Sequence, residues 1–336
     1  MRLKETLPTK ALALLFLFGF LLTASAQDFQ IRTRVDLVVV PVTVKGSNGV
    51  VATGLRRDDF AVFENGKRQV VTNFSVDPVP ISAAILVDTG LSVSSYEKVY
   101  NSFPALAGAF SDFDEIAVYR FDKFVTRLLD FTNDKLLVET TLRKLEEPSP
   151  AGNPTITGGP FSAIGPVING VPASGGGPEP GTHAAPPGAK LLHDAIFTAA
   201  GSLAQRKVDR RRIILVVSDG QAKGDIHSFQ ESVNQLLDRG IQIYAVGLDS
   251  SFFSRRFSVL NAYAQQTGGD ACFLNSQRAM EACYVKSTEE ARNQYILGYV
   301  SNNKVSGLFR VFRDIDVRVE KPGLETRHRK GYFQYP

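Results

Sequence analysis

Two aspartates end runs of apolar residues whose patterns indicate buried strands. Asp88 closes the run ISAAILVD, and Asp219 closes the run RIILVVSD. Ligands of a doubly wound sheet bind beyond the carboxyl ends of its strands, so two neighbouring strands of this kind would bring both carboxylates together. Like charges at close range are costly unless a cation lies between them. Thr89, Ser92 and Ser218 add hydroxyl oxygens, and such an all-oxygen set suits Mg²⁺, Ca²⁺ or Mn²⁺ better than Zn²⁺.

Strand-like and helix-like segments alternate between residues 79 and 294. The apolar run at 81–87 is almost continuous, which is typical of a strand buried on both faces of a sheet. Similar short runs predict further strands at 115–121, 124–129, 212–217, 241–246 and 271–274. Apolar residues at helical spacing predict helices at 95–110, 133–146, 190–204, 226–239, 256–266 and 276–293. The alternation predicts an α/β fold, a doubly wound and mostly parallel sheet flanked by helices.

Both flanks of this region have the pattern of antiparallel strands. In the N-terminal portion, 27–78, two short alternating runs surround Asn65-Gly66, a pair that favours a hairpin turn because both residues tolerate a positive φ. After the α/β region, strands are predicted at 294–300, 309–319 and 326–333. We expect residues 27–78 and 295–336 to pack together as a second, smaller β module, with residues 79–294 inserted between them.

The motifs and their order resemble the von Willebrand factor type A domain. Asp88-Thr-Gly-Leu-Ser92 follows the first buried strand, and Asp219-Gly220 follows a later one. In that family an Asp-x-Ser-x-Ser motif, a threonine and an aspartate form the metal-ion-dependent adhesion site. The flanking stretches DFAVFENGKRQVVTNFSV, QYILGYV, VEKPGL and RKGYF are similar to the VWFA-related proteins of acidobacteria. The resemblance covers nearly the whole mature chain and implies a secreted, non-enzymatic module that binds a protein partner.

The sequence departs from the family's metal site at two positions. Gly90 stands where a serine ligand is expected, and Lys190 stands where the threonine is expected, within the stretch GAKLLHDA. We hypothesise that the Lys190 ammonium replaces the divalent cation, since it can neutralise carboxylates and donate three hydrogen bonds to them. Binding of Mg²⁺ or Mn²⁺ would then be weak or absent, although Thr182 is an alternative source of the hydroxyl. The resemblance implies a contact surface for a partner's acidic side chain that includes Asp88, Gly90, Ser92, Lys190 and Asp219.

The first 26 residues have the pattern of a secretory signal. Basic residues precede an apolar run at 11–22, and Ala24-Ser25-Ala26 offers a cleavage site. The run is too short to span a ~30 Å hydrocarbon core, so we expect a secreted or periplasmic protein without stable membrane insertion after cleavage, an uncleaved anchor being the alternative. Of the net charge of +4, the leader carries +2. The remaining charge gives no reason to expect a nucleic-acid partner.

Two further sequence features bear on the exported state and on the domain. Cys272 and Cys283 are the two cysteines of the chain, and either a disulfide or two separately buried thiols is compatible with the sequence. Residues 148–189 contain ten prolines and ten glycines among 42 residues. This composition buries too little apolar surface to offset its ordering entropy, which predicts a long surface insertion within the α/β domain.

The histidines offer no evident catalytic pair. His183 falls in the insertion, His328 in a basic tail strand, and His227 opens a helix without an evident partner. His193 and Asp194 are adjacent on a helix, so their side chains diverge by about 100° and cannot form a tight pair. No catalytic motif for a serine hydrolase, zinc protease or phosphate loop is present, so we expect no enzyme. The alternatives are a structural or assembly component of the cell envelope with an inactive site and, less favoured, a hydrolase using Ser92 with His193 and Asp219.

Three other groups receive simple structural interpretations. The basic residues that precede the strand at 212–217 are interpreted as a charged helix-to-strand loop. Asp270, after Thr267-Gly268-Gly269, is interpreted as a turn residue. Four tail tyrosines form either an exposed aromatic patch or part of the strand packing: Tyr295, Tyr299, Tyr332 and Tyr335.

Overall fold

The computed structural model describes residues 37–146, 167–168, 171–172, 188–248, 258–303 and 308–336. The leader at 1–26, Thr182, His183 and most of the 148–189 segment therefore lie outside the described residues. Within the described part of the chain, no helix is long and apolar enough to cross a membrane.

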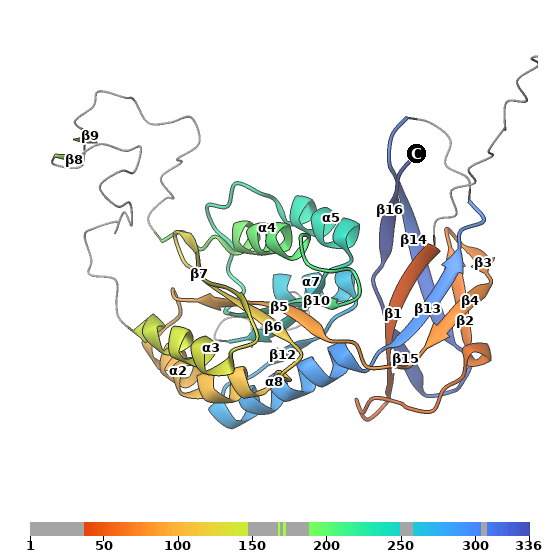
Figure 1. The fold of residues 1–336 in the computed structure, drawn as a ribbon, viewed down its shortest axis with the longest axis horizontal. Helices are drawn as coiled ribbons and strands as arrows, with labels where there is room; N and C mark the ends of the chain where they lie inside the picture. The colour runs from red at the N-terminus through yellow and green to blue at the C-terminus, as the bar shows by residue number, and fades with distance from the viewer. Residues whose placement is uncertain (1–36, 147–166, 169–170, 173–187, 249–257, 304–307) are drawn as a thin grey trace, which may run out of the picture. The chain divides into compact units, whose positions relative to one another are not determined.

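A six-stranded sheet forms the centre of the α/β region (Figure 1). Its order is β12 (Ala271–Phe273), β11 (Gln242–Gly247), β10 (Arg211–Ser218), β5 (Ile81–Asp88), β6 (Glu115–Phe121), β7 (Val125–Thr132). All neighbouring pairs are parallel except β6 with the edge strand β7. Counted along the chain this is the order 3-2-1-4-5-6 of doubly wound folds, read from β7. The predicted α/β architecture with a mostly parallel sheet is confirmed.

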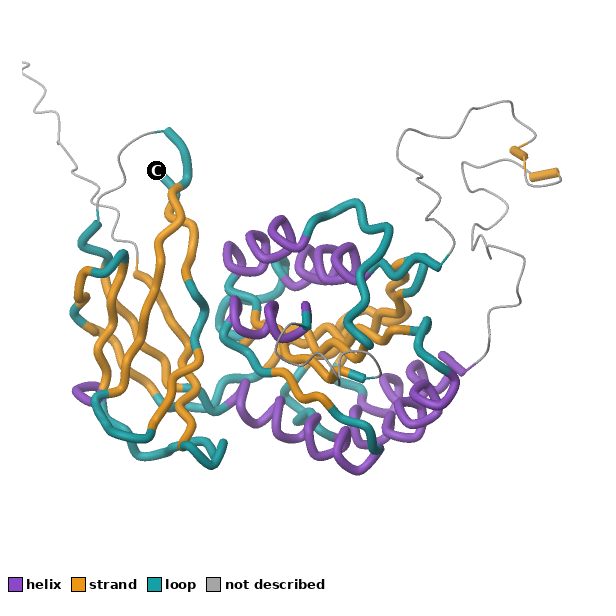
Figure 2. The backbone as a smooth tube through the Cα atoms, turned by 180° about the vertical axis from the view of Figure 1, so that it is seen from behind, coloured by secondary structure: helices purple, strands orange, loops and turns teal. Residues whose placement is uncertain are grey.

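Helices cover both faces of this sheet, as the purple segments on either side of the orange strands show in Figure 2. One apolar core holds side chains from α2 (Val93–Gly108), α3 (Lys135–Arg143) and α8 (Gln277–Arg292). The other holds side chains from α4 (Leu192–Leu203), α5 (Phe229–Arg239) and α7 (Val259–Thr267). Strand β5 serves both cores because its residues alternate, with Ile85 in the first and Leu86 in the second. Complete burial of each such side chain contributes about 1.5–3 kcal/mol.

Two four-stranded antiparallel sheets contain strands from both terminal portions of the chain. The first is ordered β15 (Leu324–Arg327), β1 (Leu37–Gly46), β13 (Tyr295–Val300), β4 (Val71–Ser75). The second is ordered β16 (Gly331–Gln334), β14 (Val311–Val319), β2 (Phe60–Glu64), β3 (Lys67–Gln69). Val42 of the first sheet and Val62 of the second are fully buried in one shared apolar core. Asn65 and Gly66 both have positive φ in the β2–β3 turn, as the hairpin signal predicts.

The remaining short elements are η1 (Arg57–Asp59), η2 (Lys144–Glu146) and the pair β8 (Val167–Ile168) and β9 (Val171–Pro172).

The α/β region leaves and rejoins the first antiparallel sheet through neighbouring strands. Strand β4 precedes it, strand β13 follows it, and the two pair directly, Phe74 opposite Leu297. The connections also touch, since the Val79 amide donates to the carbonyl oxygen of Arg292 at 3.4 Å.

One expectation about the tail needs correction. The strand predicted at 326–333 is two strands, because β15 and β16 belong to different sheets and buried His328 lies between them. Its Nε2 accepts a hydrogen bond from the Val317 amide at 3.1 Å, which ties this crossing to β14. The alternatives left open for the four tail tyrosines are also resolved: Tyr295, Tyr299 and Tyr332 are buried in the strand packing, and Tyr335 is exposed.

Candidate functional site

The carboxyl ends of β5 and β10 bring Asp88 and Asp219 together. Lys190 joins them, and these three residues are called the notch below. Asp88 is fully buried, and its Oδ2 accepts a hydrogen bond from Ser218 Oγ at 2.8 Å. The Lys190 Nζ lies 2.5 Å from Asp219 Oδ2 and 3.6 Å from Asp88 Oδ2. The side chain of Lys190 is 13% exposed. An ammonium group is therefore held between two carboxylates that the sheet places side by side.

Main-chain hydrogen bonds fix the segment that carries Lys190. The amides of Lys190 and Lys223 each donate to the other's carbonyl oxygen at 2.9 Å. The Leu191 amide donates to Asp122 O at 2.7 Å. These contacts tie the start of α4 to the loops that follow β10 and β6, so the ammonium is positioned before any partner arrives.

Gly90 and Lys190 meet in space. A Cβ built on Gly90 would lie 3.3 Å from Lys190 Cε and 3.3 Å from Asp88 Oδ1. The Gly90 amide also donates to Asp88 Oδ1 at 2.8 Å. A side chain at position 90 would thus require Lys190 to shift by a few tenths of an ångström. Glycine at 90 and lysine at 190 fit each other.

Burial dominates the electrostatics of Asp88. It raises the pKa of this carboxyl above its ordinary value; Lys190 and Ser218 oppose the shift, and the neighbouring Asp219 charge adds to it. The folded protein then binds this proton more tightly than the unfolded chain does. Ionisation of Asp88 therefore lowers the free energy of unfolding as pH rises from the ordinary carboxyl range through the raised pKa.

The hydroxyl groups expected to serve as cation ligands make structural hydrogen bonds. Ser92 is the N-cap of α2 and accepts from the Ser95 amide at 3.4 Å. Thr89 Oγ1 donates to Phe121 O at 3.4 Å. Across the described ranges, no three His, Cys, Asp or Glu side chains are grouped to hold a metal ion. With an ammonium between the carboxylates, the donor set as it stands does not fit a divalent cation.

A second polar cluster was not foreseen, and it corrects the expectation for His227. The Asp194 Oδ1 lies 2.7 Å from His227 Nδ1, and the imidazole stacks on Phe197 with ring centroids 3.7 Å apart. The His193 Nδ1 lies instead 2.8 Å from the Tyr263 hydroxyl, so the adjacent pair His193-Asp194 does diverge. Burial lowers the pKa of His193 despite nearby carboxylates. His193 is engaged by tyrosine here, and nothing in its contacts supports a base for Ser92.

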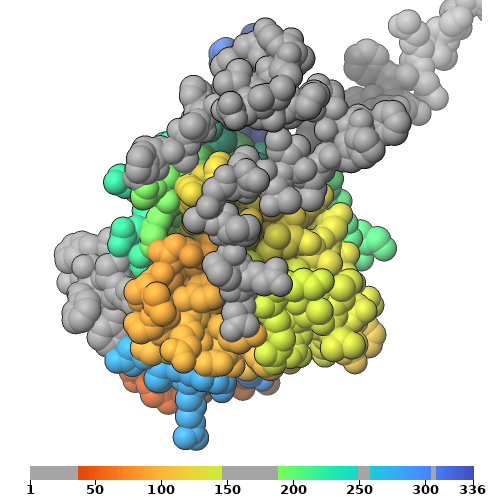
Figure 3. Space-filling model, turned by 90° about the vertical axis from the view of Figure 1, so that its left-hand side faces the viewer, coloured from red at the N-terminus to blue at the C-terminus, as the bar shows by residue number. Residues whose placement is uncertain are grey.

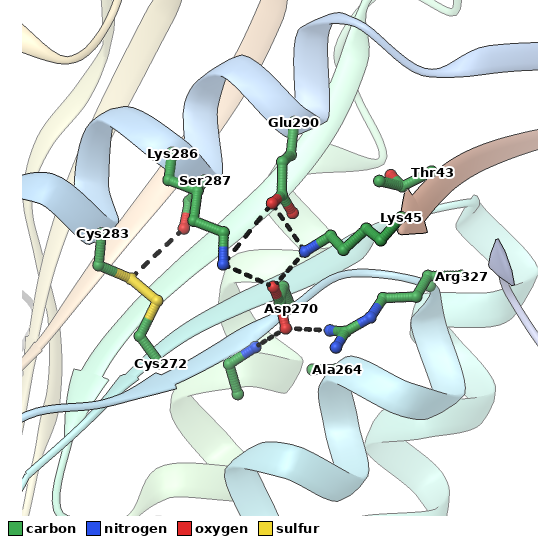
Figure 4. Close-up of polar contacts among 12 residues, drawn as sticks. Thr43, Lys45, Ala264, Asp270, Cys272, Cys283, Lys286, Ser287, Glu290 and Arg327 are labelled. Carbon is green, nitrogen blue, oxygen red and sulfur yellow. Dashed lines mark hydrogen bonds and ion pairs between the residues drawn. A yellow bond between two sulfur atoms is a disulfide. The ribbon is translucent and has the colours of Figure 1, made fainter. Parts of the chain in front are cut away.

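Asp270 is not a simple turn residue, which is a further correction. Its Oδ2 lies 2.6 Å from Lys45 Nζ, which in turn lies 2.7 Å from Glu290 Oε1 (Figure 4). Lys286 stands 3.4 Å from Asp270 Oδ2, and Arg327 pairs with Asp270 Oδ1. This ion cluster, defined as Lys45, Asp270, Lys286, Glu290 and Arg327, joins β1 and β15 to α8 and to the residue just before β12. No local signal marks it, because its members are far apart in sequence.

Cys272 and Cys283 form a disulfide, which settles the alternative left open by the sequence. The bond joins β12 to α8 beside the ion cluster (Figure 4). Closing a short loop of this size contributes on the order of 3 kcal/mol through the entropy of the unfolded chain.

The surface near the notch also carries exposed apolar side chains. Val93 opens α2 just after β5 and is 87% exposed, and Phe124, in the turn after β6, is 58% exposed. Lys123 and Lys223 are exposed on the loops after β6 and β10. Figure 3 shows the side of the molecule where the orange segment around α2 and the yellow-green segment around α3 lie together.

No family model and no curated protein sequence matches this chain. Solved structures with a similar arrangement include an aerotolerance-related membrane protein from Bacteroides fragilis, at 15% identity and TM-score 0.41, covering 62% of this chain and 99% of that one. Proximal thread matrix protein 1 from the mussel byssus, with a zinc-occupied MIDAS motif, has 14% identity and TM-score 0.44, covering 68% of this chain and 49% of that one. Manganese-loaded TRAP protein from Plasmodium vivax has 10% identity and TM-score 0.44, and the match covers 81% of this chain and 98% of that one. At TM-scores below 0.5 these likenesses do not assign the chain to a family.

Proposed function

We propose that this chain is an exported, non-enzymatic binding module of the von Willebrand factor type A kind, in which Lys190 takes the place of the divalent cation. The observation that carries the proposal is the position of Lys190 Nζ between Asp88 and Asp219. The disulfide supports export, since disulfides persist in oxidising compartments. The module would recognise a protein partner through the notch and the loops around it.

The contact chemistry follows from the charges at this edge of the sheet. The Lys190 ammonium has three donors, and its side chain is 13% exposed, so a partner's carboxylate can pair with it directly rather than through a metal. Lys123 and Lys223 add positive charge beside the notch, and Val93 and Phe124 add apolar area. The partner expected is thus a protein segment with an acidic side chain next to apolar ones. Apolar contacts with the partner supply affinity, and the ion pair with Lys190 fixes the register in which the partner's segment binds.

Restoring the missing ligands should restore metal binding. The double variant Gly90→Ser/Lys190→Thr removes the ammonium and returns two hydroxyls to the notch, so we expect it to bind Mn²⁺ in calorimetry while the native protein shows no tight binding. The single variant Gly90→Ser, with the ammonium still present, should not bind. Tight Mn²⁺ binding by the native protein that Lys190→Thr leaves unaltered would refute the replacement of the cation by Lys190.

Reversing the charge at the notch should abolish partner capture. We expect proteins retained from an envelope extract by the immobilised native chain to be lost, about 10-fold or more, with Lys190→Glu, because a like charge then faces the partner's carboxylate. Lys67→Glu, an exposed change in the β2–β3 hairpin, is the matched control, and a chelator should have no effect. If Lys190→Glu retains the same proteins as the native chain, the contact surface is misassigned and a structural role in the envelope becomes the better account.

A further inference from the structure

Strand β4 is an unprotected edge of the first antiparallel sheet. Within the described part of the chain it pairs with β13 on one side, and no strand lies against its other side. The unpaired main-chain groups of such an edge are a template for pairing with another strand. The sequence of β4, VTNFS, contains neither a charged residue nor a proline. Its ladder with β13 shifts register at Gly298 and Tyr299, but Asn73, Phe74 and Ser75 remain in regular register.

The other edge strands of the three larger sheets each carry a feature that discourages pairing. Charged side chains occur on β3, β7 and β15. Strand β12 has only three residues, and β16 packs against α5. Among the edges of the described sheets, β4 is therefore the one most open to a partner strand.

The residues around β4 are arranged so that the strand can pair with a second copy of itself. In an antiparallel pair with Asn73 on the two-fold axis, each residue faces the one equally far from Asn73 in the other copy. Val70 of one copy then faces Val76 of the other. These apolar side chains are 73% and 55% exposed in the single chain. Asn73 faces its own copy, and its amide group carries both a donor and an acceptor. Self-pairing thus covers a pair of exposed valines at each end of the new ladder.

An open groove of about 380 Å³ beside β4 carries two arginines. Arg57 and Arg68 line it together with Val70. Their side chains are 56% and 66% exposed, and their carboxylate neighbours are Asp58 at 3.3 Å and Glu320 at 3.7 Å. Exposed ion pairs of this kind contribute little, so a carboxylate that arrives from a partner can displace them.

The second copy supplies a carboxylate at this groove. In the register centred on Asn73, Asp77 of one copy lies beside residue 69 of the other, next to Arg68. Asp77 is exposed, and its Oδ2 accepts a hydrogen bond from Ser75 Oγ at 2.8 Å. No lysine or arginine among the described residues forms an ion pair with it. The charges as well as the valines are therefore complementary when the partner strand is β4 of a second copy.

We propose that two copies of this chain associate through β4, antiparallel and with Asn73 on the two-fold axis. The four-stranded sheets of the two copies then join into one continuous sheet. The contact is reciprocal, so Asp77 of each copy pairs with Arg68 of the other. Main-chain hydrogen bonds between the strands supply affinity, and the two ion pairs fix the register. The association uses no residue of the notch, so failure of either proposal leaves the other in place.

Sedimentation velocity of the whole mature chain over a range of concentrations tests the association. We expect a dimer at micromolar concentrations that dissociates on dilution. A chain that remains monomeric throughout the range overturns the proposal.

A cysteine at the axis tests the position of the contact. Directly opposed residues of antiparallel strands have Cα atoms about 4.5–5.5 Å apart, within the range that a disulfide spans. Under mild oxidation, Asn73→Cys should therefore give a disulfide-linked dimer. Glu325→Cys, at an exposed position of the edge strand β15, is the control and should not cross-link. No cross-link with Asn73→Cys, or equal cross-linking of both variants, overturns the assignment to β4.

A charge exchange tests the register. Arg68→Asp and Asp77→Arg should each weaken the dimer about 10-fold or more, because like charges then face each other at both reciprocal contacts. The double variant Arg68→Asp/Asp77→Arg restores opposite charges and should recover most of the affinity. Both native side chains are exposed, so we expect the fold to persist. Arg278→Asp, at an exposed position of α8, is the control and should have no effect. A double variant that dimerises as weakly as the single variants overturns this register.

Discussion

Replacing Lys190 with methionine should destabilise the folded protein by about 3–5 kcal/mol in metal-free buffer at neutral pH, because two buried carboxylates lose the cation between them. Asp88 is fully buried and Asp219 nearly so, which leaves little water to screen their repulsion. Methionine keeps most of the aliphatic stem, so lost packing contributes little to the effect. The measurement is the free energy of unfolding from urea denaturation in the presence of a chelator.

Two comparisons isolate the charge as the cause. Lys223→Met changes the residue that faces Lys190 across the backbone bridge, and because its side chain is exposed we expect a change below about 0.5 kcal/mol. Adding Asp88→Asn to Lys190→Met removes one of the repelling charges and should recover a large part of the loss. A Lys190→Met protein as stable as the native one would show that the ammonium does not neutralise this notch.

Asp270→Asn should cost a similar 3–5 kcal/mol, because it leaves three cations of the ion cluster facing Glu290 alone. Lys45, Asp270 and Glu290 are each less than 10% exposed at the side chain, so the charge of Lys45 cannot be fully hydrated without opening the structure, whereas Lys286 and Arg327 are about half exposed. Asp316→Asn, which breaks an exposed pair on β14, is the matched control and should change stability by no more than about 1 kcal/mol. Equal stabilities of the two variants would contradict the importance of the cluster.

The same variant should change how stability depends on pH. Burial would raise the pKa of Asp270, but the hydrogen bond from Lys45 and the charges of Arg327, Lys45 and Lys286 outweigh it and hold the pKa below its ordinary value. A lowered pKa contributes stability above the ordinary carboxyl range, which is lost as pH falls through the folded-state pKa. Native stability should therefore fall more steeply at acid pH than that of Asp270→Asn, as unfolding curves at several acid pH values would show.

Local pattern predicts the sheet and the positions of its acids. Burial on both faces makes 81–88 and 212–219 continuous apolar runs, and the parallel arrangement then requires Asp88 and Asp219 to share one edge. The departures at Gly90 and Lys190 are also visible in the sequence. Their steric match is not, because the contact between a Cβ at 90 and Lys190 Cε joins residues a hundred positions apart.

Long-range polar contacts account for the expectations that were wrong. His227 gains its partner from Asp194, 33 residues earlier, and Asp270 gains Lys45 from 225 residues earlier. The break of the final strand at His328 likewise depends on a hydrogen bond from β14. Residue type and spacing along one element carry no information on such pairings, which depend on how separate layers meet.

The side-by-side arrangement of β4 and β13 has a consequence for evolution and engineering. Adjacent strands lie only about 4.8 Å apart, so the chain can be cut at this point and a different domain spliced in without disturbing the surrounding ladder. A transplanted domain would, however, have to satisfy one electrostatic requirement. Lys45 and Arg327 project from the recipient scaffold toward acids that only the resident segment supplies, so a successful graft must bring matching carboxylates at the positions of Asp270 and Glu290.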